Sequence, residues 1–297
     1  MKSKVIIILG PTAVGKSDLA VRIAHQFNGE VISADSRQIY KGLNIGTGKI
    51  TKKEMRGIPH YLLDIEDPKN KFNVTDFVQL ANNAIGYISH NKKLPIICGG
   101  TGFYIDSLIS GTEFSAVKEN PVLRAKLDKK TAAQLLVQLK KMDAARARTI
   151  DIHNKVKIIR AIEIASVLGK VPKLKMGTKK FDTLFIGLNI DRDELRERIM
   201  LRLIKRLKNG MIEEVKSLHK KGLSWKRMGE LGLEYRYVAL YLQKKITKKA
   251  MIEKLHTEIC RYAKRQMTWF RRNKEIQWFE PDQTNKIERD VKVFLGK

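Results

Sequence analysis

Four short apolar runs are spaced along the chain, and segments with helical periodicity lie between them. The run KVIIIL (4–9) comes first, and GEVISAD (29–35), LPIICGGTG (94–102) and TLFIGLNI (183–190) follow. A segment such as VTDFVQLANNAIGYISH (74–90) repeats its apolar positions every three or four residues, as an amphipathic helix does. Strands that alternate with helices predict an α/β fold, in which helices flank a parallel sheet.

Glycine-rich or polar segments follow three of these runs, at 10–17, 35–38 and 99–101. In parallel sheets of this kind, ligands bind beyond the carboxyl ends of the strands. We therefore expect these three segments to meet in one cleft, and we take their side chains as the candidates for chemistry.

The longest stretch without a strand pattern lies between the third and fourth runs. Residues 113–180 have helical patterns and hold 17 Lys or Arg against 6 Asp or Glu. We predict that they form a basic helical insertion domain, with 169–180 as its return linker. Residues 1–112 and 181–297 then make up the α/β core, which ends in long C-terminal helices.

The charge of the chain points to a polyanionic partner. Its 297 residues carry 59 Lys or Arg against 31 Asp or Glu, a net charge of +28. Such an excess favours nucleic-acid binding, and a Lys-biased composition that aids solubility is the alternative. Cys98 and Cys260 lie far apart, which indicates neither a disulfide framework nor a zinc site. No apolar run is long enough for a membrane span or a signal peptide, so we expect a cytoplasmic protein. Nothing in the sequence demands an oligomer, and we expect a monomer.

The segment GPTAVGKS (10–17) follows the first strand and opens a helix. Its G-x-x-x-x-G-K-[ST] pattern is that of a P-loop, whose backbone N–H groups and helix N-terminus hold phosphate oxygens. Lys16 would supply a positive charge and Ser17 a hydroxyl ligand for Mg²⁺. The motif predicts phosphate binding, but it does not identify the molecule that carries the phosphate.

Polar side chains at the next two strand ends complete the expected cleft. Asp35 ends the second strand, where a carboxylate can ligate Mg²⁺, act as a general base or simply cap a turn. Ser36, Arg37 and Gln38 follow, and a Gln can pair with the edge of an adenine. Thr101 follows the third strand and would present its hydroxyl to the same cleft.

Two later helices carry basic side chains at helical spacing. Arg198 and Arg202 lie one turn apart, which suits either a solvated row of charges or a clamp on a diphosphate. The segment ICRYAKRQMTWFRRNK (259–274) interleaves basic and aromatic residues. It can be an amphipathic helix packed on the core, a track for a phosphate backbone, or both.

From these residues alone, three functions stay open. The protein could be a small-molecule kinase that uses ATP, an enzyme that acts on RNA and holds a substrate's phosphate in the P-loop, or a non-catalytic RNA-binding protein. A metabolite kinase does not need a charge of +28. A pure binder does not need Asp35 and Thr101 beside the loop. Composition does not decide among the three.

Six segments, in order along nearly the whole chain, resemble the tRNA dimethylallyltransferase (tRNA isopentenyltransferase) family. They are GPTAVGKS, ISADSRQIYKGLNIGTGK, GIPHYLLDIEDP, GGTGFYIDSLISG, RAIEI and AKRQMTWFRR. The resemblance implies a P-loop NTPase-like sheet and transfer of a dimethylallyl group from dimethylallyl diphosphate to the N6 amine of the adenosine next to the anticodon, position 37 of tRNA. It also implies that diphosphate leaves, that Mg²⁺ assists and that the anticodon stem-loop is bound.

The resemblance also assigns roles to individual residues. Asp35 would be the general base on the adenine amine, Thr101 would orient the reacting groups, and Ser17 would bind the metal. The residues expected to hold the diphosphate are those of the loop and two arginines: Gly10, Pro11, Thr12, Ala13, Val14, Gly15, Lys16, Ser17, Arg198 and Arg202. The residues expected to contact tRNA are Asp35, Ser36, Arg37, Gln38, Thr101, Arg124, Val156, Lys157, Ile158, Ile159, Arg160, Tyr235 and Arg236.

Three positions depart from the family pattern. Lys157 stands where an Arg is usual, and Lys keeps the charge but lacks the bidentate fork of a guanidinium. Glu234 replaces a Gly ahead of Tyr235 and Arg236, and GTGKI (46–50) replaces the usual GTAKP. The expected catalytic positions all match, so we expect these departures to bear on tRNA preference rather than on activity.

Overall fold

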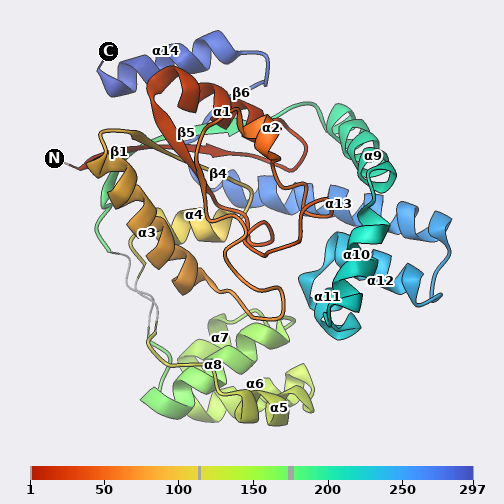
Figure 1. Ribbon diagram of the computed structural model, residues 1–297. Helices are drawn as coiled ribbons and strands as arrows, with labels where there is room; N and C mark the ends of the chain where they lie inside the picture. Colours follow the sequence, from red (N-terminus) through yellow and green to blue (C-terminus); the bar gives the residue numbers. More distant parts are fainter. Residues whose placement is uncertain (1, 113–114, 173–176, 297) are drawn as a thin grey trace. The chain divides into compact units, whose positions relative to one another are not determined.

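The structure, a computed structural model, describes residues 2–112, 115–172 and 177–296 (Figure 1). It divides into two compact units, one made of residues 1–110 and 179–297 and the other of residues 111–178. The expected insertion covers 113–180, and its positions 113–114 and 173–176 lie outside the described residues.

The larger unit is built on a six-stranded sheet in which every pair of neighbouring strands is parallel. Its spatial order is β3 (His60–Tyr61), β2 (Gly29–Ser33), β4 (Leu94–Gly99), β1 (Ser3–Leu9), β5 (Phe181–Leu188) and β6 (Gln277–Phe279). The four strands predicted from the apolar runs are confirmed. The sheet also contains β3 and β6, whose few residues carry no recognisable apolar run.

The central strand is apolar on both faces because helices cover both sides of the sheet. Residues Val5, Ile6, Ile7 and Ile8 of β1 have no exposed surface. Helices α1 and α14 lie over one face and α3, α4 and α13 over the other (Figure 1). The predicted P-loop α/β fold is therefore confirmed.

Ten helices of the larger unit are described, and several begin at residues that cap their first N–H groups. In α3, Asn73 and Asp76 form a reciprocal capping box, which fixes the start of that helix. The helices are α1 (Lys16–Phe27), α2 (Lys52–Met55), α3 (Val74–His90), α4 (Gly102–Ile109), α9 (Arg192–Lys208), α10 (Met211–Lys220), α11 (Trp225–Leu231), α12 (Leu233–Leu242), α13 (Lys248–Phe270) and α14 (Thr284–Leu295). Among the described residues, no helix is both long and apolar enough to cross a bilayer.

The smaller unit is helical, with a hydrophobic cluster of its own. It consists of α5 (Pro121–Asp128), α6 (Ala132–Met142), α7 (Ala144–Thr149) and α8 (Lys155–Leu168). Leu135, Leu139, Ile158 and Ile162 are fully buried between these helices. Four short helices around a separate core explain why this stretch shows no strand pattern.

Candidate active site

A cavity of about 610 Å³ opens at the carboxyl ends of β1, β2 and β4. The P-loop, the end of β2, the loop 44–50 and the helices α9 and α13 supply its walls. Among its lining residues are Thr12, Ala13, Gly15, Lys16, Ser17, Asp35, Gln38, Gly48, Arg198, Arg202, Arg206, Tyr262 and Gln266. The structure thus brings together most of the residues expected to hold the diphosphate, along with Asp35.

The P-loop has the backbone shape of an anion site. Gly10 has φ +143°, and a Cβ there would lie 2.4 Å from the carbonyl oxygen of Leu188, so only glycine fits. Gly15, with φ +99°, precedes α1, and no side chain caps the first N–H groups of that helix. These N–H groups and the helix dipole favour a bound anion.

Lys16 lies inside the loop that it is expected to serve. Its ammonium group donates a hydrogen bond to the carbonyl oxygen of Pro11 at 2.6 Å. Burial lowers the pKa of Lys16 to about 8. A lysine held in this way can exchange its carbonyl partner for a phosphate oxygen, which stabilises the charged form better.

Asp35 ends β2 with one carboxylate oxygen committed to the backbone. Its Oδ1 accepts hydrogen bonds from the N–H groups of Arg37, at 2.8 Å, and Gln38, at 3.3 Å. Asp35 therefore does cap a turn, but this takes only one of its oxygens. The turn orients the carboxylate at the cavity wall, and the other oxygen stays available to a ligand.

Thr101 joins the ends of β2 and β4. Its hydroxyl accepts from the N–H of Ser36 at 3.2 Å, and its own N–H donates to the carbonyl oxygen of Ala34 at 3.2 Å. The two strand ends approach so closely that a Cβ on Gly99 would lie 2.2 Å from the Ala34 oxygen. Thr101 is therefore held beside Asp35 through the residues that flank it, as the strand-end argument predicts.

Two residues of α13 reach the same region, and neither was predicted from the sequence as a site residue. The amide of Gln266 accepts from the N–H of Thr12 and donates to the carbonyl oxygen of Gly100, each at 2.9 Å. Tyr262, one turn earlier, forms a hydrogen bond with Thr101, and burial and the charge of Asp35 raise its pKa. The i,i+4 spacing of these residues was a signal, but only packing shows that their side of α13 meets the P-loop.

Helix α9 presents three arginines to the cavity wall. Arg202 donates to the carbonyl oxygen of Gly48 at 3.3 Å, and burial together with the nearby Arg206 lowers its pKa to about 10. Arg198 is 42% exposed and pairs with Glu194 at 2.6 Å. Arg206, which was not predicted from the sequence as a site residue, is more enclosed than Arg198.

Several residues expected to contact tRNA have other partners in the structure. Tyr235 is 2% exposed, and its hydroxyl donates to Glu214 at 2.9 Å. Ile158 and Ile159 belong to the buried cluster of the smaller unit. These three expectations need correction, because a buried side chain has no surface to offer to RNA.

The arginines of the smaller unit are also engaged. Arg124 makes two hydrogen bonds to the buried Glu163, at 2.8 and 2.7 Å, and Arg160 makes one at 3.3 Å. By contrast, Val156 is 73% exposed and the side chain of Lys157 is 59% exposed. In the larger unit, Arg236 is exposed and donates to the carbonyl oxygen of Gly229.

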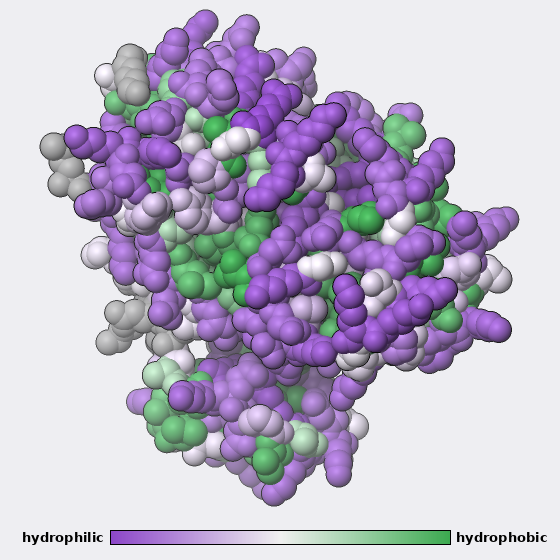
Figure 2. Space-filling view, viewed as in Figure 1, coloured by the Kyte–Doolittle hydropathy of each residue, from purple (hydrophilic) through white to green (hydrophobic). Residues whose placement is uncertain are grey.

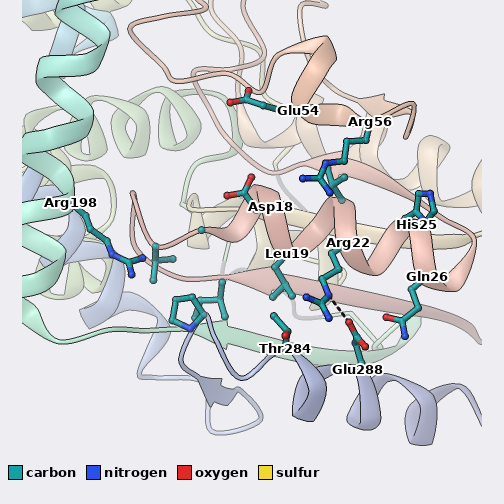
Figure 3. Close-up of a pocket in the computed structure, with 15 residues that line it drawn as sticks. Asp18, Leu19, Arg22, His25, Gln26, Glu54, Arg56, Arg198, Thr284 and Glu288 are labelled. Carbon is teal, nitrogen blue, oxygen red and sulfur yellow. Dashed lines mark hydrogen bonds and ion pairs between the residues drawn. The ribbon is translucent and has the colours of Figure 1, made fainter.

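A second hollow, of about 820 Å³, lies along the outer side of α1 (Figure 3). An ion pair between Arg22 of α1 and Glu288 of α14, 2.6 Å long, forms part of its wall. Lys16 and Asp35, which line the first cavity, do not line this one. Although it is the larger of the two, it lacks the lysine and the strand-end carboxylate, and we place the chemistry in the first cavity.

A glycine-rich loop after the central strand, next to a strand-end carboxylate and a row of arginines, defines a P-loop α/β protein built to act on a phosphate-bearing ligand. The model of one family, IPP transferase, matches residues 38–273. The chain belongs to this family of prenyl transferases.

Relatives and solved structures cover nearly all of the chain. A tRNA dimethylallyltransferase 2 of Treponema denticola is 45% identical over 276 residues, 91% of this chain and 92% of that protein. A tRNA dimethylallyltransferase of Bacillus subtilis is 38% identical over 98% of this chain and 94% of its own.

The crystal structure of a tRNA isopentenylpyrophosphate transferase from Bacillus halodurans matches with a TM-score of 0.76 and 34% identity, over 99% of this chain and 97% of that one. A eukaryotic dimethylallyltransferase acting on tRNA matches with a TM-score of 0.84 and 29% identity, over 98% of this chain and 78% of its own.

Proposed function

We propose that this protein transfers a dimethylallyl group from dimethylallyl diphosphate to the N6 amine of adenosine 37 in tRNA and releases diphosphate. One observation carries the proposal: the P-loop and Asp35 line the same cavity. The reaction needs a site for a departing diphosphate and a base for an amine proton, and both must flank the same carbon atom. The names and coverage of the relatives support the same reaction.

The chain's own groups can carry out the bond changes. The N6 nitrogen attacks C1 of the dimethylallyl group, the bond between C1 and the diphosphate oxygen breaks, and the amine proton moves to Asp35. The turn that fixes Oδ1 of Asp35 leaves Oδ2 for this proton. A flipped adenine is required, because a base stacked on its neighbours cannot bring its amine into the cavity.

The negative charge that develops on the leaving group falls within reach of positive groups. Lys16, Arg202 and the N–H groups at the start of α1 all border the cavity. Fixed positive groups of this kind stabilise a departing oxyanion without further rearrangement. Thr101, held by Ser36 and Tyr262, would orient the adenine amine against the donor.

Mg²⁺ fits this cavity. It commonly takes one or two protein oxygens and completes its shell with substrate phosphates and water. Ser17 is exposed at the cavity wall and would hold the ion through its hydroxyl. Among the described residues, His, Cys, Asp and Glu form no cluster of three or more that could hold a metal. We expect the diphosphate and water to supply the further ligands. The bound ion would neutralise charge on the leaving group.

We further propose that tRNA binds over a broad basic surface of the chain. Hydrophilic side chains cover most of the face seen in Figure 2, and residues 113–180 carry 17 basic against 6 acidic residues. Residues 35–38 would contact the flipped nucleotide. Exposed residues of the smaller unit such as Lys157 would grip the stem-loop, while Arg124 and Arg160 would act indirectly by holding Glu163.

A direct test is incubation with radiolabelled dimethylallyl diphosphate, Mg²⁺ and an unmodified tRNA transcript with adenosine at position 37. We expect label in the RNA, and none when that adenosine is replaced by guanosine. ATP-dependent phosphorylation of a metabolite without RNA labelling would establish a kinase instead, and RNA binding without any turnover would establish a binding protein. We expect the protein to be a monomer in solution and to act in the cytoplasm.

A further inference from the structure

Glu234 is a carboxylate next to the arginine row of the cavity. It lies in the first turn of α12 with its side chain 12% exposed, and its Oε1 accepts from Nη1 of Arg206 at 3.0 Å. Burial raises the pKa of Glu234, while Arg206 and Arg202 oppose that shift. A buried acid so close to a proposed diphosphate site calls for an explanation, because its charge opposes binding.

One nitrogen of the Arg206 guanidinium has two hydrogen-bond acceptors. The same Nη1 that meets Glu234 donates to the carbonyl oxygen of Gly46 at 3.1 Å. A Cβ on Gly48 would lie 1.9 Å from Nη2 of Arg206 and 2.6 Å from Nη2 of Arg202. Both arginines therefore pack directly on the loop 44–48, and glycine at 48 is what permits it.

A second set of contacts holds the same loop. Glu214 accepts from the N–H groups of Asn44, Ile45 and Gly46, at 3.0, 2.7 and 3.0 Å, and from the hydroxyl of Tyr235. Two neighbouring residues at the start of α12 are thus linked to one loop: Glu234 through Arg206, and Tyr235 through Glu214. The carbonyl oxygen of Gly48 in this loop accepts from Arg202 and from the amide of Gln38.

We propose that Glu234 is a positioning residue that holds Arg206 on the loop 44–48 and offsets its charge, so that Arg202, rather than Arg206, is the enclosed guanidinium that exchanges its carbonyl partner for the diphosphate. Arg206 also borders the cavity. Without Glu234, the guanidiniums of Arg202 and Arg206, one turn apart on α9, would both donate hydrogen bonds to the diphosphate. Glu234 therefore weakens the hold on the leaving group after transfer and speeds its release.

This inference rests on the proposed function, and the test separates the two. Glu234→Gln keeps the shape and removes the charge, and Glu213→Gln removes one charge from an exposed site on α10 as the matched control. Calorimetry with inorganic diphosphate gives the affinity. Prenyl transfer to tRNA is then measured under single-turnover and steady-state conditions.

For Glu234→Gln we expect inorganic diphosphate to bind at least about tenfold more tightly, the scale of one additional charge-assisted contact. The single-turnover rate should stay within about twofold, while steady-state kcat falls as product release becomes limiting. Glu213→Gln should behave as wild type. Adding Arg206→Gln to Glu234→Gln should return the affinity to the wild-type value, which a merely structural role would not do.

Unchanged diphosphate affinity in a folded Glu234→Gln protein, or the same change in Glu213→Gln, would overturn the inference. If Glu234→Gln does not fold, Glu234→Ala decides, because it removes the same charge and should tighten diphosphate binding in the same way. A protein that shows the diphosphate effect but does not prenylate tRNA would retain the inference about this site and refute the proposed function.

Discussion

At the scale of single residues, Asp35 combines two tasks that a substitution can separate. Asp35→Asn keeps an oxygen that can accept from the N–H groups of Arg37 and Gln38, and it removes the base. We expect transfer to tRNA to fall about 10²–10⁴-fold, the usual contribution of a general base. Binding of tRNA, measured by filter retention, should change little.

The matched comparison is Asp35→Ala, which removes the turn acceptor as well. We expect Asp35→Ala to lower the melting temperature and Asp35→Asn to leave it near the wild-type value, since only the alanine leaves two N–H groups without their acceptor. Transfer within a few-fold of wild type in Asp35→Asn would refute the assignment of Asp35 as the base.

The lowered pKa of Lys16 makes diphosphate binding depend on pH. Lys16 is charged below pH of about 8, and a bound diphosphate favours the charged form. Above that pH, binding must take up a proton, so we expect affinity to weaken by up to about tenfold per pH unit. Calorimetry of inorganic diphosphate binding between about pH 7 and 9.5 tests this prediction. The control is Lys16→Met, which should bind diphosphate weakly and should not lose affinity through this group as the pH rises.

The same group affects stability in the opposite sense. Its ordinary pKa of 10.5 applies to the unfolded chain, and the folded value is lower. Between the two values, the unfolded chain binds more protons, so the contribution of Lys16 to stability rises with pH; below the folded value it is constant.

A diphosphate affinity that stays the same across the range from about pH 7 to 9.5 would contradict the burial of this ammonium group.

At the scale of secondary-structure elements, α13 supports the P-loop through one buried amide. Gln266→Leu removes both of its hydrogen bonds, to Thr12 and to Gly100. We expect the KM for dimethylallyl diphosphate to rise about tenfold or more, because the loop loses its fixed start, with a smaller effect on kcat. Steady-state kinetics at saturating tRNA measures both parameters.

Two further variants serve as an intermediate case and as a control for that prediction. Gln266→Glu keeps an acceptor for Thr12 but loses the donor to Gly100, so its KM should lie between those of wild type and Gln266→Leu. Gln243→Leu removes a half-buried amide bonded within α12, and its KM should equal that of wild type. A KM raised equally by Gln243→Leu would mean that lost stability, not loop position, explains the effect.

The helices of the smaller unit depend on the buried carboxylate of Glu163. It is 1% exposed and meets Arg124, Arg160 and the N–H of Asn120. We expect Glu163→Gln to destabilise this unit by about 3 kcal/mol, the low end for breaking a buried pair, because Arg124 keeps some contact with water.

Hydrogen exchange resolved by segment measures this effect. Amides of α5 and α8 should exchange faster in Glu163→Gln, and those of β1 and β4 should not. The control is Glu119→Gln, which removes a more exposed partner of Arg124 and should change stability by less than about 1 kcal/mol. Equal acceleration in both units would show that the smaller unit does not unfold by itself.

At the scale of the whole molecule, the sequence predicts the fold better than it predicts which residues touch RNA. Continuous apolar runs identified the four buried strands, and the rule for parallel sheets placed Asp35 and Thr101 together. The strands His60–Tyr61 and Gln277–Phe279 were missed because two or three residues show no periodicity. Gln266 and Arg206 were missed because the face of a helix that meets a cavity depends on tertiary packing. Motif matching alone could not show that Tyr235 and Ile158 are buried.

The net charge of the chain gives the last prediction, which concerns tRNA affinity and salt. Each phosphate that a lysine neutralises releases counterions, so log K falls with log salt in proportion to the number of neutralised phosphates. Lys126, Lys129 and Lys130 are exposed in the smaller unit. Replacing all three by Gln should weaken tRNA binding and lower the salt slope by about 0.7 for each phosphate that the variant no longer neutralises.

The matched control replaces Lys244, Lys245 and Lys248, three exposed lysines of the larger unit, in the same way. Both triple variants remove the same charge, so a slope that changes only in the first locates the tRNA-binding surface on the helical unit. Equal changes in both would mean that the net charge of +28 attracts RNA as a diffuse field. Neither variant should alter the affinity for inorganic diphosphate, because Lys16 and Arg202 lie outside both sets.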